Sequence, residues 1–116
     1  MIRDDRVYLQ HIHDAANRID LYLSDMHFEA FCAHPMAQDA IIRQFEIIGE
    51  AAKNLSDATR RQAPELPWKA MAGMRDKLIH QYFGVDIWQV YKTAREDLPL
   101  IKAQVLLLLG SGVEKQ

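Results

Sequence analysis

The sequence predicts an all-α protein, an up-and-down helical bundle in which residues 1–116 form a single domain. Apolar residues recur at steps of three and four along most of the chain, and the alternation of apolar and polar residues that marks a strand is absent. The contents of hydrophobic (49%) and charged (26%) residues are ordinary for a soluble globular protein. Some helices carry apolar residues on more than one face, which leaves apolar surface for a second copy of the chain. We therefore expect the bundle to form a homodimer.

The first helix is expected from Arg3 to about Ser24, because its apolar residues fall on one face. That face contains Leu9, Ile12, Ala16, Ile19 and Leu23. A short second helix is expected to run to about Ala33, with Ser24 and Asp25 as its capping residues.

A long third helix follows, because His34 and Pro35 form a typical helix start with proline in the first turn. The helix is expected to end near Leu55. Its main stripe contains Ile41, Phe45, Ile48, Ala52 and Leu55. Ile42 and Ile47 widen the stripe, so this helix should pack against neighbours on more than one side.

Two acidic residues of the third helix, Glu46 and Glu50, lie one turn apart and repel each other unless Arg43 or Lys53 intervenes. The simpler interpretation is a charged face with local ion pairs. The functional interpretation is that Glu46 supports the arginine or histidine of an active site.

A fourth, short helix is expected over Asp57–Gln62 and is ended by Pro64 and Pro67. Trp68 then opens a helix that contains the segment MAGMRDKLIHQYFGVD, with Gly84 as a left-handed C-cap. We call it the motif helix.

Asp86 and Gln89 form a capping-box pattern that starts the closing helix. From Ile87 onward its stripe contains Tyr91, Ala94, Leu98, Ile101, Val105 and Leu108. Pro99 is expected to kink this helix or split it in two. Residues 111–116 are expected to form a frayed tail.

The motif helix carries three residues suited to chemistry, Arg75, His80 and Tyr82. A guanidinium can hold a phosphate, and an imidazole can move protons near neutral pH. On a straight helix Arg75 and His80 are about 140° apart around the axis and about 7.5 Å apart along it, so they point to different faces. Either the helix distorts near Gly84, or a second copy of the chain supplies the missing partner. Asp76, one turn before His80, can orient the imidazole and favour its protonated form.

Each of these residues also has an ordinary structural explanation. Arg75 could be a core arginine paired with an acid, His80 a surface histidine and Tyr82 a packing aromatic. His11 and His13 diverge on their helix, so we expect surface histidines there rather than a metal pair. No glycine-rich phosphate loop, metal-ligand spacing or activated nucleophile is found, and no metal or cofactor is expected.

The formal net charge of −2 excludes a broadly basic surface, so an RNA contact needs a local patch. The first ten residues lack the apolar run of a secretory signal, and the apolar run Val105–Leu109 is too short to span a membrane. Cys32 is the single cysteine and suits a reducing compartment. We therefore expect a cytoplasmic protein.

The spacing Arg-x-x-x-x-His-x-Tyr, formed by Arg75, His80 and Tyr82, resembles the signature of HepT-like toxins, a branch of the HEPN ribonuclease superfamily. The likeness extends to AIIRQFEIIGEAAKNLS (residues 40–56), PELPW (residues 64–68) and the closing helix. The resemblance implies a metal-independent endoribonuclease in which the 2′-hydroxyl of the RNA attacks the phosphate and leaves a 2′,3′-cyclic phosphate. It also implies a cleft between two subunits, with His80 as general acid or base and Arg75 as the phosphate contact.

The resemblance further implies a toxin that is neutralised by an MntA-like nucleotidyltransferase antitoxin, which transfers AMP to Tyr82. The chief alternative is a non-catalytic module that binds a nucleotide or the nucleotidyltransferase, with His80 only positioning a phosphate. Asp76 favours this alternative, because a carboxylate beside Arg75 lowers the local positive potential. A purely structural helical dimer would explain the apolar stripes but would leave the combination of Arg75, His80 and Tyr82 to chance.

Overall fold

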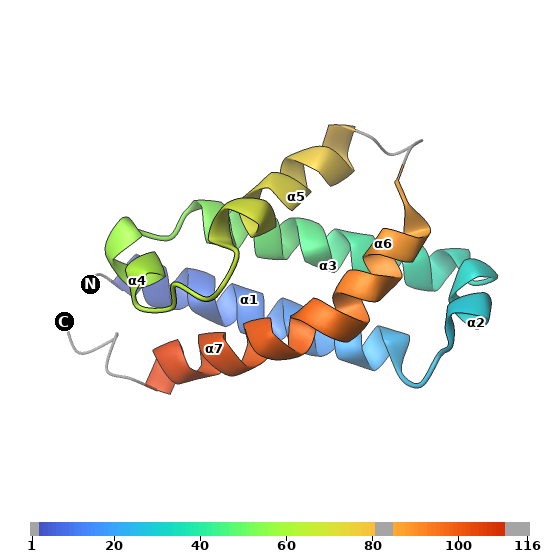
Figure 1. Ribbon diagram of the computed structural model, residues 1–116, viewed down its shortest axis with the longest axis horizontal. Coiled ribbons are helices and arrows are strands. Elements are labelled where there is room, and N and C mark those ends of the chain that lie inside the picture. Colours follow the sequence, from blue (N-terminus) through green and yellow to red (C-terminus); the bar gives the residue numbers. More distant parts are fainter. Residues whose placement is uncertain (1–2, 81–84, 111–116) are drawn as a thin grey trace.

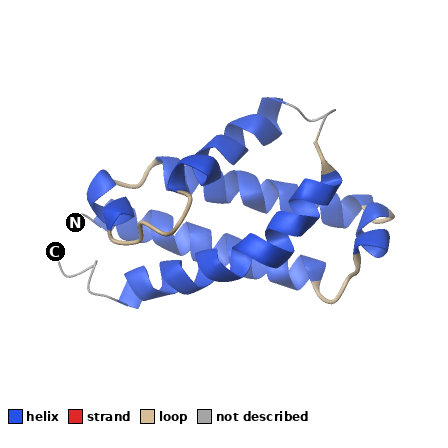
Figure 2. Ribbon diagram, in the orientation of Figure 1, coloured by secondary structure: helices blue, strands red, loops and turns tan. Residues whose placement is uncertain are grey.

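The computed structural model describes the backbone of residues 3–80 and 85–110, and the side chains of residues 5–74 and 85–110. Within these ranges every regular element is helical (Figure 2), which confirms the predicted all-α class. The elements are α1 (Arg3–Leu23), α2 (Phe28–Cys32), α3 (Pro35–Lys53), α4 (Asp57–Arg61), α5 (Trp68–His80), α6 (Ile87–Lys92), the π-helical turn η1 (Thr93–Asp97) and α7 (Leu98–Gly110).

The long helices run up and down the molecule (Figure 1). Helix α1 packs against both α3 and α7, and α5 packs against α3. Helices α6 and α7 follow one another through η1 without a break, so the chain returns along the bundle as one bent rod. The core between these helices includes the fully buried side chains of Leu9, Ile12, Ile19, Leu23, Phe31, Ile41, Phe45, Leu98 and Val105.

The start of the second helix differs from the prediction. Helix α2 begins at Phe28, with His27 rather than Ser24 or Asp25 at its N-cap position. Ser24 instead ends α1, because its backbone is left-handed (φ 50°) and its amide donates to the carbonyl of Asp20 at 2.8 Å. A residue that closes one helix in this conformation moves the start of the next helix further along the chain.

The other helix starts were predicted correctly. The Nδ1 atom of His34 accepts a hydrogen bond from the amide of Ala37 at 3.1 Å and caps α3. The carboxylate of Asp86 accepts from the amide of Gln89 at 3.3 Å and caps α6. Helix α5 starts at Trp68. Local capping chemistry therefore specifies most of the boundaries.

The closing helix bends between α6 and α7 but is not divided there, as Figure 1 shows, and Pro99 is the second residue of α7. In the turn before it, the amide of Leu98 donates to the carbonyl of Thr93, five residues earlier. Proline has no amide hydrogen, and its ring clashes with the carbonyl four residues before it, here that of Arg95. The wider π-helical turn makes room for the ring, which is the physical origin of the bend.

Two expectations fall on residues that the structure does not describe, namely the C-cap at Gly84 and the tail at residues 111–116. The last described helix, α7, extends to Gly110. Over residues 3–80 and 85–110, none of the helices combines the length and the hydropathy needed to cross a membrane.

Candidate functional site

The candidate residues Arg75, Asp76 and His80 lie on α5, whose backbone is helical without a break from Trp68 to His80. Their side chains, and Tyr82 entirely, lie outside the described residues. For an uninterrupted helix, the positions of Arg75 and His80 differ by about 140° around the axis and about 7.5 Å along it. The backbone up to His80 therefore keeps the separation expected from the sequence.

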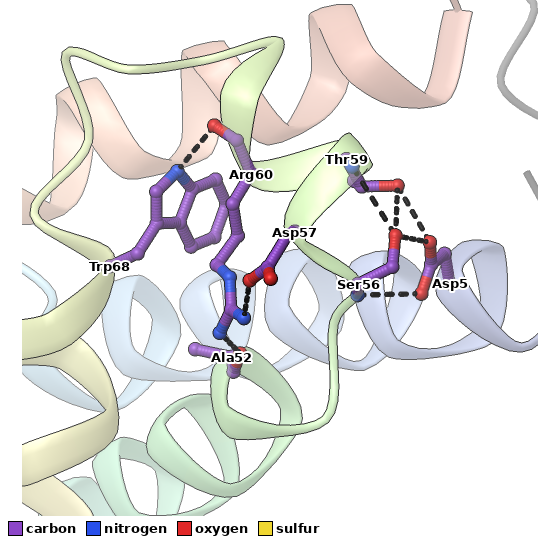
Figure 3. Close-up of polar contacts among 7 residues, drawn as sticks. All are labelled: Asp5, Ala52, Ser56, Asp57, Thr59, Arg60 and Trp68. Carbon is purple, nitrogen blue, oxygen red and sulfur yellow. Dashed lines mark hydrogen bonds and ion pairs between the residues drawn. The ribbon is translucent and has the colours of Figure 1, made fainter.

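Helix α5 is anchored at its first residue. The side chain of Trp68 is buried, and its indole N–H donates to the carbonyls of Ala63 (2.9 Å) and Arg60 (3.1 Å; Figure 3). Met71, almost one turn later, is also buried. These contacts fix where the motif helix begins and which face of its first turn packs on the bundle.

A buried carboxylate ties the region before α5 to α1. Asp5 is only 2% exposed, and it accepts hydrogen bonds from the Ser56 amide (3.1 Å), the Ser56 hydroxyl (2.5 Å) and the Thr59 hydroxyl (2.6 Å), as Figure 3 shows. Burial by itself raises the pKa of a carboxyl. The three hydrogen bonds outweigh this effect and hold the pKa of Asp5 below its ordinary value of 3.8.

The same contacts organise α4. The Ser56 hydroxyl accepts a hydrogen bond from the Thr59 amide at 3.2 Å and so caps this helix, while it donates to Asp5. One charged group therefore positions the N-terminus of α4, which lies between α3 and the motif helix.

Asp5 was not among the residues predicted from the sequence, although a signal for it is present. It precedes Leu9 by four residues and therefore stands on the apolar face of α1, where an acid needs a partner. The partners, Ser56 and Thr59, lie 51 and 54 residues further along the chain. Only the fold shows that they meet Asp5.

Glu46 lies at an open hollow of about 250 Å³ between α1 and α3. Its carboxylate is 3.4 Å from a guanidinium nitrogen of Arg43, so the local ion pair anticipated on this face is formed. Tyr8 and His11 of α1 form the opposite wall of the hollow. A role of Glu46 in supporting Arg75 or His80 stays a prediction, because the side chains of residues 75–80 are not described.

His11 and His13, the two histidines of α1, lie in different surroundings. His11 lines the hollow, whereas the ring of His13 lies 3.4 Å from the side-chain amide of Asn17. In the part of the chain that the structure describes, no group of three or more potential metal ligands could hold an ion.

A second group of side chains that the sequence did not reveal lies where α6 and η1 meet the chain around α2. We call it the aromatic junction; it consists of Phe28, Phe31, Trp88, Tyr91 and Arg95. The Tyr91 hydroxyl donates to the carbonyl of Met26 at 2.9 Å. The Arg95 guanidinium donates to the carbonyls of Met26 (2.7 Å) and Ser24 (3.1 Å). The junction therefore holds the start of the closing helix against the turn between α1 and α2.

The sequence was compared with known families and proteins. The family model described as ribonuclease HepT-like matches residues 12–108. A relative named probable ribonuclease HepT, from Thermococcus cleftensis, is 45% identical over 104 residues, which cover 90% of this chain and 94% of the relative.

Two further relatives carry provisional RNase names. One, from Methanocaldococcus jannaschii, is 42% identical over 97% of this chain and 97% of its own length. The other, from Caldanaerobacter subterraneus, is 39% identical over 93% of this chain and 96% of its own length. No solved structure matches the chain.

Proposed function

This chain belongs to the HepT-like ribonuclease family, and from that premise we propose that it is a metal-independent endoribonuclease and the toxin of a toxin–antitoxin pair. The observation that carries the proposal is the position of Arg75 and His80 on one continuous helix. A phosphate-binding cation and a group that titrates near neutral pH suit this cleavage chemistry.

The proposed reaction uses groups that the protein and the RNA supply. The 2′-hydroxyl of a ribose attacks the adjacent phosphorus and gives its proton to a base. The bond from phosphorus to the 5′-oxygen breaks, and that oxygen takes up a proton, which leaves a 2′,3′-cyclic phosphate and a 5′-hydroxyl. His80 acts as the general acid or base, and Arg75 stabilises the charge that grows on the phosphate.

The helix geometry supports a composite site between two subunits as part of this proposal. Because Arg75 and His80 point about 140° apart on a straight helix, one subunit would supply Arg75 and the other His80 to the same phosphate. The net charge of −2 fits a small cleft better than a broad basic surface. Asp76 and Glu46 are the candidates for orienting the imidazole or the guanidinium in that cleft.

Transfer of AMP to Tyr82 completes the proposal. A nucleotidyltransferase antitoxin would move AMP from ATP to the phenol oxygen and release pyrophosphate. A bulky anion two residues from His80 would then exclude the RNA phosphate by size and by charge. Mass spectrometry after coexpression with the antitoxin should find one AMP on Tyr82, and AMP on another residue instead would contradict this part.

The deciding experiment is cleavage of transfer RNA or total RNA by the unmodified protein in EDTA, with analysis of the product ends. We expect cyclic phosphate from the wild type, and a loss of at least about 100-fold in His80→Ala and in Arg75→Ala, with unchanged helical content. Lys69→Ala is the matched control, because it removes an exposed cation from the same helix.

Full activity of His80→Ala would contradict the mechanism. Nucleotide binding without cleavage by the unmodified wild type would instead support the non-catalytic module.

A further inference from the structure

Trp88 is an aromatic side chain that the fold holds in place and yet leaves 50% exposed. Its ring centroid lies 4.8 Å from that of Phe28, at an interplanar angle of 79°, and 6.2 Å from that of Tyr91, at 20°. Contacts with two neighbouring rings restrict the orientation of the indole. Among the exposed large apolar side chains of the described residues, the other aromatic one, Tyr22, is less exposed at 36%.

The support beneath Trp88 is itself well fixed. Tyr91 packs against Phe28 (5.4 Å) and Phe31 (5.5 Å) and is tied to the chain by its hydrogen bond to Met26. Phe31 belongs to the fully buried core. The exposed indole therefore rests on a rigid base, so little ordering cost remains when a flat ligand stacks on it.

Positive charge lies beside this base. The Arg95 guanidinium is 5.4 Å from the centroid of the Tyr91 ring and donates to its hydroxyl at 3.3 Å. Its other described hydrogen bonds also go to neutral acceptors, the backbone carbonyls of Ser24 and Met26. These contacts position the guanidinium without cancelling its charge. Lys92, the last residue of α6, is partly exposed and adds a second cation.

The ring also lies close in sequence to the motif helix. Trp88 is the second residue of α6, the next helix after α5. The chain from His80 to Ile87 spans at most about 25 Å even when fully extended. A single-stranded RNA bound at the proposed cleavage site could thus reach the indole within a few nucleotides.

From these observations we propose that Trp88 is a stacking platform for an unpaired base of the RNA substrate, with Lys92 and Arg95 attracting the backbone. The inference rests on the proposed function and adds to it a contact outside the catalytic pair. Every base has a flat face, so stacking holds single-stranded RNA without specifying the base.

The test measures binding of a fluorescent single-stranded RNA oligonucleotide to the His80→Ala protein, which is expected not to cut it. Adding Trp88→Ala should weaken binding about 5- to 150-fold at every salt concentration, because a stacked base releases no counterions. Trp88→Phe should restore most of the affinity. Lys92→Ala should instead reduce the slope of log affinity against log salt by about 0.7.

Leu107→Ala is the matched control, since it removes an exposed apolar side chain (64% exposed) from α7 rather than α6. We expect it to bind RNA like its parent. Thermal melting and sedimentation of each variant report its folding and its oligomeric state.

Equal RNA affinity of Trp88→Ala and its parent, while wild-type protein still cuts RNA, would overturn the stacking platform and leave the proposed function intact. A wild type that neither binds nor cuts RNA would overturn both. A Trp88→Ala protein that loses its oligomeric state but keeps its affinity would also overturn the platform, because the ring would then belong to a protein interface.

Discussion

The two ends of the bundle hold distant segments together by different chemistry. Near α4, buried Asp5 joins α1 to Ser56 and Thr59 through three hydrogen bonds. At the opposite end, the aromatic junction joins α6 to the chain around α2, and Trp88 remains half exposed. Figure 1 shows that α5 starts at the first end and rises towards α6.

The two ends should therefore contribute differently, the polar end near α4 mainly to folding stability and the aromatic end mainly to binding. A buried carboxylate is costly to remove when its donors are left unpaired, and of the Asp5 partners Thr59 is fully buried and Ser56 partly buried. A half-exposed ring contributes less to folding, because part of its surface stays in water in the folded state. Substitutions near α4 should therefore change the free energy of unfolding, whereas changes at Arg75, His80 or Trp88 should change RNA cleavage or RNA binding.

The largest expected effect tests whether two subunits share one active site. Arg75→Ala and His80→Ala should each be inactive alone. If one subunit supplies each group, refolding equal amounts together should recover about a quarter of wild-type activity, because half of the dimers are mixed and each has one intact site of two. RNA cleavage by the mixture measures this directly.

Lys69→Ala refolded with His80→Ala controls for the refolding itself. An inactive mixture of Arg75→Ala and His80→Ala, whose oligomeric state equals that of the wild type, would show that both groups act within one subunit.

The next effect concerns the polar end. Asp5→Ala should lower the free energy of unfolding by about 3 kcal/mol, because it leaves the amide of Ser56 and the hydroxyl of Thr59 without their acceptor. Urea unfolding followed by circular dichroism measures the loss. Asp14→Ala is the matched control on α1, since Asp14 is exposed and accepts only a surface hydrogen bond from Gln10 in the described contacts. Equal losses in both variants would contradict the assigned role of Asp5.

A smaller effect is expected at the aromatic end. Tyr91→Phe removes the hydroxyl that bonds to Met26 but keeps the ring, so we expect a loss of about 1 kcal/mol of unfolding free energy. RNA affinity should stay close to that of the wild type, because the Trp88 platform is retained. A strong loss of affinity without a loss of stability would show that the hydroxyl itself contacts RNA.

The smallest effect is the pH dependence that Asp5 adds. The pKa of Asp5 is below 3.8 in the folded protein, so its contribution to stability is present above that value and disappears as the pH falls through the folded pKa. Melting temperatures between about pH 6 and about pH 3 should therefore fall more steeply for the wild type than for Asp5→Asn. Parallel curves would contradict this linkage.

Local signals explain which boundaries could be predicted from the sequence. His34 and Asp86 cap helices where they were expected to, because capping acts between residues within one turn. Helix α5 also begins at Trp68 as expected. Ser24 was interpreted wrongly, since its type suits the start of a helix, whereas its left-handed backbone ends one. The side-chain type alone does not distinguish these two uses.

Contacts over long sequence distances explain what was missed. Asp5 meets its partners 51 and 54 residues away, and Tyr91 meets Met26 across 65 residues. The residues adjacent to Asp5 and Tyr91 in the sequence do not indicate which distant residues they contact. The choice of Arg75 and His80 came instead from their spacing and from the family likeness, and their proposed roles await the cleavage experiment.

The sequence by itself determined the all-α class, most helix starts and the separation of Arg75 and His80 on one helix, because periodicity and capping depend on residues within a few positions of each other. Only the tertiary structure decided that Asp5 would be the buried tie to α4 and that Trp88 would rest on a rigid base with one side in water. The physical reason is that both depend on which helices pack together, and packing joins residues that the chain keeps far apart.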